Sequence, residues 1–171
     1  INGYSGNGIF KYDSPDMNGA TLSVGYIPGR DGHESVIDAA VAYTGIETVN
    51  IATSGTSLLD GTHTMPTSAV NEQMNISGTG SLTLGAVTAD TITSTMTGTG
   101  TLTMSLGAAT NYTGGANVDA VTGSTAADII NGGASADTIL NQATSVDDTA
   151  NDILTGGDGF DTFVLVGDSA S

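Results

Sequence analysis

The sequence contains no cysteine or tryptophan and almost no basic residues. Its 171 residues include 18 acidic residues but only two bases, Lys11 and Arg30, so the formal net charge is −16. Because there is no cysteine, neither a disulfide nor a thiolate zinc site can form. An acidic surface repels nucleic acid and anionic membranes, which are bound through cationic patches. Such a surface attracts cations instead.

Long hydrophobic runs and abundant aromatic residues are also missing. No apolar stretch approaches the length of a membrane-spanning helix, so the sequence predicts no membrane insertion. Aromatic residues make up only 5% of the chain, which disfavours a large aromatic core and suits thin, closely stacked layers. The chain opens on Ile1 without a signal-like segment, and we therefore expect it to be part of a larger protein.

The residue types that catalysis uses most often are scarce. The two histidines, His33 and His63, are expected in separate, solvent-exposed loops and belong to no metal-ligand pattern. A cysteine nucleophile is impossible, and no serine stands in a nucleophile-elbow context. The chain is therefore predicted not to be an enzyme and to have no catalytic residues.

Residues 1–45 are predicted to flank the main fold as loops, a hairpin and one short helix. Alternation of apolar and polar residues over 20–27 predicts a strand. Apolar residues on one face predict a helix of about three turns over residues 33–43, which Gly45 would end. Residues 45–51 are then predicted to form a strand.

Residues 46–113 are predicted to form solenoid turns rich in threonine, serine and glycine. The stretch Ser77-Gly-Thr-Gly-Ser-Leu-Thr-Leu-Gly85 recurs 20 residues later as Thr97-Gly-Thr-Gly-Thr-Leu-Thr-Met-Ser105. Self-similarity at such a period is typical of stacked solenoid turns. Leucine, isoleucine, valine and methionine are expected to point inward and threonine outward, at a period of two.

Residues 114–168 carry five nonapeptides that resemble the signature G-G-x-G-x-D-x-U-x, in which U is apolar. Three run in phase from Gly114, and two follow after a six-residue insertion over 141–146. The sixth positions are Asp119, Asp128, Asp137, Asp152 and Asp161. The eighth positions, which are expected to fill the core, are Val121, Ile130, Ile139, Leu154 and Phe163.

The nonapeptides combine the two kinds of oxygen that calcium prefers. Glycine allows a turn whose carbonyl groups point inward, and the sixth-position aspartate adds a carboxylate. Calcium accepts six to eight such hard oxygen ligands. We therefore predict that the chain holds several structural calcium ions. The predicted metal-binding residues are Asp119, Asp128, Asp137, Asp152, Asp158 and Asp161 with Gly114, Gly123, Gly132, Gly156 and Gly159.

Stacking of the nonapeptides gives a second argument for calcium. Loops two repeats apart would lie on the same edge, with Asp119, Asp137 and Asp161 on one edge and Asp128 and Asp152 on the other. Neighbouring turns are about 4.8 Å apart. Two carboxylates at that distance repel by roughly 3–4 kcal/mol at an effective dielectric of 20. We therefore expect residues 114–164 to be largely unfolded without calcium.

The match to the signature is incomplete. The fourth position is glycine only at Gly159, and the other repeats have Asn117, Ala126, Ser135 and Ala150 there. Alanine and serine tolerate a left-handed backbone less well than glycine or asparagine. We therefore expect about three well-formed sites rather than one for each repeat. A looser match around Asp90 is predicted to be a plain solenoid corner.

The nonapeptides resemble the RTX family of secreted bacterial proteins. The order of the Gly45–Ile51 stretch, the Thr/Ser-rich turns and the nonapeptides is similar to surface-layer (S-layer) proteins that carry RTX repeats. This resemblance implies an all-β, right-handed parallel β-solenoid or β-roll. It further implies a homo-oligomeric two-dimensional lattice on a Gram-negative cell surface, type I secretion and a requirement for calcium. Attachment to a cell-surface polysaccharide would lie outside this chain.

Other functions share some of these features. A calcium-dependent RTX adhesin module would also be an acidic roll, and some secreted enzymes end in such a roll. An adhesin would present a binding surface, but the five tyrosines are scattered along the sequence. An ice-binding face is disfavoured because Gly98 and Gly100 interrupt the threonine series.

Overall fold

The structure is a computed structural model of the chain. It describes residues 10–11, 21–26, 35–36, 40–43, 46–65, 71–142 and 150–166. Side chains are described from residue 40 onward within these ranges.

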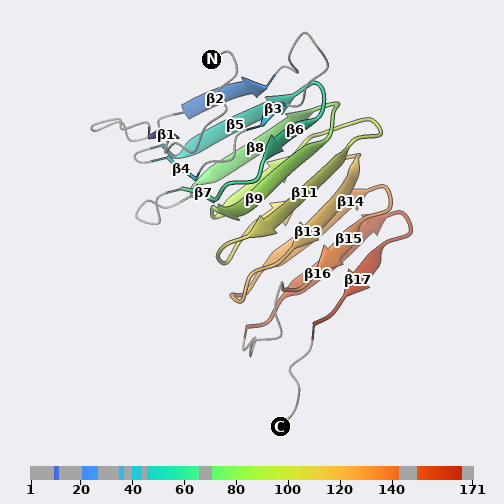
Figure 1. Cartoon of the computed structure of the whole chain (residues 1–171). Coiled ribbons are helices and arrows are strands. Elements are labelled where there is room, and N and C mark those ends of the chain that lie inside the picture. Colours follow the sequence, from blue (N-terminus) through green and yellow to red (C-terminus); the bar gives the residue numbers. More distant parts are fainter. Residues whose placement is uncertain are drawn as a thin grey trace.

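Two parallel β-sheets face each other along the molecule, and the chain passes between them in about six solenoid turns (Figure 1). This architecture confirms the predicted β-solenoid. Sheet A contains β1 (Phe10–Lys11), β3 (Ser35–Val36), β4 (Val41–Ala42), β6 (Ser57–Leu59), β7 (His63–Thr64), β9 (Leu82–Thr88), β11 (Thr101–Leu106), β13 (Val118–Thr122), β15 (Thr138–Leu140) and β17 (Thr162–Val164). Sheet B contains β2 (Thr21–Tyr26), β5 (Thr48–Thr53), β8 (Gln73–Gly78), β10 (Thr91–Ser94), β12 (Asn111–Thr113), β14 (Ile129–Ala134) and β16 (Ile153–Asp158).

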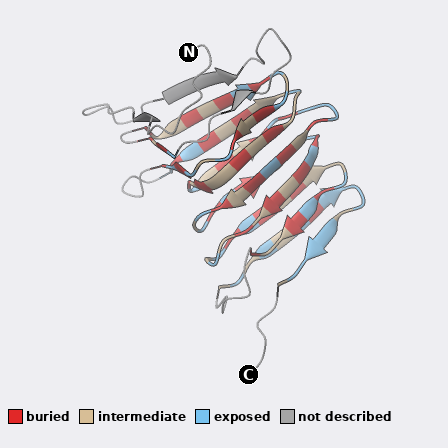
Figure 2. Cartoon of the chain, viewed as in Figure 1, coloured by how far each residue is buried: buried red, intermediate tan, exposed pale blue. Residues whose placement is uncertain are grey.

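Strand register follows the sequence repeat. Leu82 in β9 pairs with Leu102 in β11, 20 residues later, and Thr83 pairs with Thr103. The two leucines are buried, whereas Thr83 is half-buried and Thr103 is exposed. Figure 2 shows the same alternation of buried and more exposed positions along most strands. The predicted period of two, with aliphatic residues inward and threonine outward, is therefore confirmed for these strands.

The short helix predicted over residues 33–43 is wrong. Ser35–Val36 and Val41–Ala42 are strands, and no described residue is helical. Val41 N–H donates to the carbonyl of Thr62 at 2.8 Å and Tyr43 N–H to that of Thr64 at 3.0 Å. A three-turn helix is marginal on its own, so pairing with a neighbouring turn takes these backbone groups instead. The described residues accordingly include no helix capable of crossing a membrane.

The core is built from inward rows that run along the solenoid. In sheet B the register aligns Val49, Met74, Ile92, Tyr112, Ile130 and Leu154. In sheet A it aligns Met104, Val121, Ile139 and Phe163. Four of the five eighth-position residues thus face the core as predicted: Val121, Ile130 and Ile139 are buried and Leu154 packs against them. Phe163 is 45% exposed because it lies on the last described turn.

Candidate metal-binding edges

The five sixth-position aspartates lie on two edges of the roll. The first edge leads from sheet B to sheet A and carries Asp119, Asp137 and Asp161. The second edge leads from sheet A to sheet B and carries Asp128 and Asp152. Asp119 is the second residue of β13, and each of the other four aspartates directly precedes a strand. Strand register stacks each aspartate on its equivalent in the next turn. This arrangement is the one predicted from the spacing of the repeats.

A ladder of hydrogen bonds joins the stacked turns. On the first edge, Asp119 N–H donates to Oδ1 of Asp137 at 2.8 Å, and Asp137 N–H donates to Oδ1 of Asp161 at 3.0 Å. On the second edge, Thr110 N–H donates to Oδ1 of Asp128 at 2.8 Å, and Asp128 N–H donates to Oδ1 of Asp152 at 2.9 Å. Each bonded carboxylate therefore uses one oxygen to hold the preceding turn.

Asp90 makes the same kind of bond outside the nonapeptides. Its Oδ2 accepts from the N–H groups of Asn71 at 3.0 Å and Glu72 at 3.3 Å, one turn earlier. This contact fits its interpretation as a solenoid corner. The ladder itself was not predicted, although the repeated aspartate directly before a strand is the signal that would have indicated it.

Three of these carboxylates are buried. Asp119 pairs with Leu102 in the neighbouring strand, so a carboxylate continues a row that is aliphatic one turn earlier. Asp119 and Asp128 are 0% exposed and Asp137 is 1% exposed. Burial raises the pKa of Asp119 to about 6, and the nearby Asp137 carboxylate adds to that effect. Burial also raises the pKa values of Asp128 and Asp137. Keeping these groups charged therefore costs free energy unless each oxygen has a partner.

Protein donors satisfy two of the three buried carboxylates. Asp119 accepts from the Tyr112 hydroxyl at 2.8 Å and from Nδ2 of Asn117 at 2.7 Å. Asp128 Oδ2 accepts from the backbone N–H and the hydroxyl of Ser124, at 2.7 and 2.9 Å. Sequence reasoning missed the roles of Tyr112, Asn117 and Ser124. One signal was available for Tyr112, because it places a hydroxyl in a core row that otherwise holds aliphatic and thioether side chains.

Asp137 differs from the other two buried carboxylates. Its Oδ1 accepts from the N–H of Asp119 in the preceding turn, but its Oδ2 is buried and has no hydrogen-bond donor within the described residues. The amide oxygen of Asn117 is also buried there without a donor, although it carries no charge. A buried carboxylate oxygen without a donor lowers the free energy of unfolding by at least as much as the loss of a hydrogen bond to a charged group. A cation bound beside this oxygen on the first edge would therefore stabilise the fold.

Glycine positions bring carbonyl oxygens to the carboxylates. A methyl group on Gly132 would collide with Oδ2 of Asp137 and would lie 2.8 Å from the carbonyl oxygen of Gly156 in the next turn. The equivalent point at Gly114 meets Oδ2 of Asp119 and the Gly132 carbonyl oxygen. At Gly123 it meets the Asn141 carbonyl oxygen and, at 3.2 Å, Oδ2 of Asp128. Each point thus gathers one carboxylate oxygen and one carbonyl oxygen from successive turns.

The oxygen set fits calcium better than a metal bound by side chains alone. Within the described ranges, no three histidine, aspartate or glutamate side chains come together as a metal-binding group. Carboxylate and carbonyl oxygens are nevertheless the ligands that calcium takes. A calcium ion on the first edge would be held by Oδ2 of Asp137 and the carbonyl oxygen of Gly156, with further backbone oxygens of the same turns.

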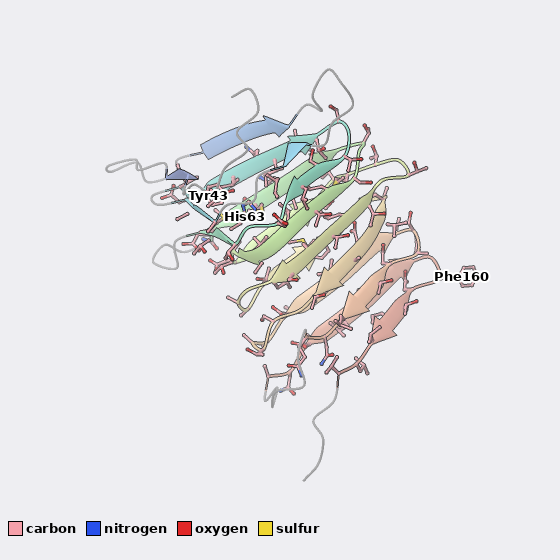
Figure 3. All side chains as sticks on the ribbon, viewed as in Figure 1. Tyr43, His63 and Phe160 are labelled. Atoms are coloured by element: carbon pink, nitrogen blue, oxygen red, sulfur yellow. The ribbon has the colours of Figure 1, made fainter. Side chains whose placement is uncertain are left out.

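The last described turn is the most exposed part of the roll. Asp158 lies at the end of β16 and is exposed, and Phe160 in the same loop is 95% exposed and points away from the sheets (Figure 3). Gly159 has a φ of 138°, as a fourth-position glycine was expected to have. Asp152 and Asp161 are half-buried, and each accepts the N–H of the aspartate one turn earlier.

Ser135 occupies the fourth position of its repeat with a φ of 91°, a region that favours glycine. We expect Ser135→Gly to raise the free energy of unfolding by about 0.5–1 kcal/mol, because relief of backbone strain outweighs the added chain entropy. The exposed bond from its hydroxyl to the Ala116 carbonyl contributes little. Ala136→Gly, at a neighbour without positive φ, is the control and should destabilise. If both variants lower the free energy of unfolding equally in denaturant, the backbone at Ser135 is not strained.

His63 is not in an exposed loop, contrary to the sequence-based expectation. It lies in β7, is 0% exposed, and stacks on Tyr43 with ring centroids 6.1 Å apart (Figure 3). Its Nδ1 accepts from the Tyr43 hydroxyl and its Nε2 donates to the Leu59 carbonyl, both at 2.9 Å. Burial lowers its pKa, so the ring is neutral. Both ring nitrogens are therefore used in hydrogen bonds within the protein. His33 lies outside the described residues.

Comparison with protein-family models, with curated proteins and with solved structures found no match to this chain. The functional interpretation therefore depends on the residues and geometry of the two edges.

Proposed function

We propose that the chain is a calcium-stabilised structural module of a bacterial surface protein, and that calcium binds along the edges of its roll. The observation that carries this proposal is the buried Oδ2 of Asp137, which has no donor among the described residues and lies with the Gly156 carbonyl oxygen beside Gly132. A bound calcium ion would supply positive charge to both oxygens and would offset repulsion between stacked carboxylates. It would thereby couple metal binding to folding.

Within this class, we propose a building block of an S-layer lattice that is exported by type I secretion to a Gram-negative cell surface. The two sheets run without interruption from the Thr/Ser-rich turns into the nonapeptides, because β11 pairs with β13 and β10 with β12. A continuous, extended solenoid is a suitable rigid element for a repeating coat. The net charge of −16 would keep such molecules apart until cations bind.

Electron microscopy of the full-length native protein tests the lattice proposal. The protein would be purified in chelator and imaged before and after addition of millimolar calcium, with magnesium as the matched control ion. We expect ordered sheets only with calcium. Dispersed particles in calcium that bind a glycan array would favour an adhesin instead. Dispersed particles that carry hydrolytic activity would favour a secreted enzyme.

A further inference from the structure

The three buried carboxylates of the roll share one local geometry. In Asp128 and Asp137, Oδ1 accepts the N–H of a residue one turn earlier, and in all three Oδ2 lies beside a carbonyl oxygen of the following turn. For Asp119 Oδ1 this interturn bond is replaced by the Asn117 amide. The facing carbonyls are those of Gly132, Asn141 and Gly156 for Asp119, Asp128 and Asp137 respectively. The three positions therefore differ mainly in what donates to Oδ2.

Strand register explains why Asp137 lacks a donor. Tyr112, whose hydroxyl donates to Asp119, pairs with Ile130 in the next turn, and isoleucine has no hydroxyl. The residue that corresponds to Ser124, at the second position of the repeat, is Gly133. Gly133 has no side chain, and its N–H donates to Oδ1 of Asn131 at 3.2 Å instead. Both sources of a hydrogen bond that serve the other two carboxylates are thus absent at Asp137.

We propose that, of the three buried carboxylates, only Asp137 requires a calcium ion, whereas the hydroxyl groups of Tyr112 and Ser124 replace the ion at Asp119 and Asp128. This inference rests on the proposed calcium-binding function. It assigns the metal requirement to the part of the first edge between Asp137 and the following turn. An ion at this position is held by Oδ2 of Asp137 and the Gly156 carbonyl oxygen. The first turns of the roll are then built without metal at their buried carboxylates, and calcium dependence begins at Asp137.

Charge-neutralising variants at the three positions test this assignment. Asn keeps an oxygen for the ladder bond at Asp137 and places an amide group opposite the Gly156 carbonyl. In chelator, Asp137→Asn should therefore melt at a higher temperature than the wild type, and its gain should exceed that of Asp119→Asn or Asp128→Asn, in which the new amide group faces an existing donor on Tyr112 or Ser124. In saturating calcium the order of Asp137→Asn and the wild type should reverse. The melting temperature of Asp137→Asn should therefore change little between chelator and saturating calcium, whereas that of the wild type should rise.

A gain-of-site variant gives an independent test that does not alter Asp137. Tyr112→Phe removes the hydroxyl that donates to Oδ2 of Asp119 and leaves that carboxylate with the Asn117 amide and the Gly115 backbone as donors, beside the Gly132 carbonyl oxygen. Calorimetric titration should then find one more calcium ion per chain than in the wild type. Phe preserves the buried ring, so the core row is maintained. An unchanged ion count would overturn the proposal that the hydroxyl stands in for the ion.

The outcomes separate this inference from the proposed function. If the wild type binds no calcium in titration, the proposed function fails and this assignment fails with it. If the wild type binds calcium but Asp119→Asn or Asp128→Asn loses as many ions as Asp137→Asn, only the assignment fails. Loss of an ion in Asp137→Asn alone, with a gained ion in Tyr112→Phe, supports both.

Discussion

Gly157→Ala is expected to lower the free energy of unfolding by about 3 kcal/mol or more. Gly157 lies in β16 with a φ of 101°, which is costly for any residue with a side chain. An added methyl group would also collide with the carbonyl oxygen of Gly133 in the adjacent turn. Backbone atoms on both sides cannot rotate away, so the strain and the collision add. Denaturant unfolding at fixed, saturating calcium measures the effect.

Gly107→Ala is the matched control. Gly107 has no positive φ, and a methyl group there would meet mainly Oγ1 of Thr88 at 2.7 Å. That hydroxyl is the end of a side chain and can move, so we expect a loss of about 1 kcal/mol or less. A cost at Gly157 no greater than at Gly107 would contradict the close stacking of the turns.

Lowering the pH from about 7 to about 4.5 in calcium-free buffer is expected to stabilise the fold. Burial raises the pKa of Asp119 to about 6 and raises those of Asp128 and Asp137, whereas an unfolded aspartate titrates near 3.9. Between these values the folded state binds protons that the unfolded state releases, so stability rises as the pH falls. This added stability is lost as the pH rises through the pKa values of the folded state. The shift of Asp119 alone corresponds to at most about 3 kcal/mol.

His63 opposes this trend. Burial lowers its pKa, so below about pH 6.5 the unfolded state takes up a proton that the folded state does not. Three carboxylates act against one imidazole, and we expect the net effect to favour folding. Thermal unfolding followed by circular dichroism at successive pH values measures the balance. Asp119→Asn should reduce the gain, and a steady fall in stability from pH 7 to pH 5 without calcium would contradict the buried carboxylates.

Repeat spacing carried most of the predictable structure. A 20-residue offset placed Leu82 next to Leu102, and the nonapeptide phase placed Asp119 next to Asp137. These predictions depend only on one residue occupying the same place in successive turns. Period-two alternation then decided which side chains face inward. Such patterns are local and repetitive, so they can be recognised without knowing which distant residues meet.

Contacts that depend on individual side chains could not be predicted in the same way. The hydroxyl of Tyr112 reaches Asp119 only because β12 and the first edge are packed in one particular register. The strand at Val41–Ala42 forms through pairing with His63–Thr64, which the helical spacing of its own apolar residues does not reveal. His63 is buried for the same reason. In each case a partner about 20 residues away or on another strand outweighs the local pattern.

Unfolding of the chain as a function of free calcium tests the central claim most directly. Melting temperature would be measured by circular dichroism from exhaustive chelation to millimolar calcium, with magnesium at the same concentrations as control. One site at a hundred times its dissociation constant adds about 2.7 kcal/mol to the free energy of unfolding. We predict a melting temperature that rises continuously with calcium and much less with magnesium. Identical unfolding curves in chelator and in millimolar calcium would contradict calcium binding by the roll.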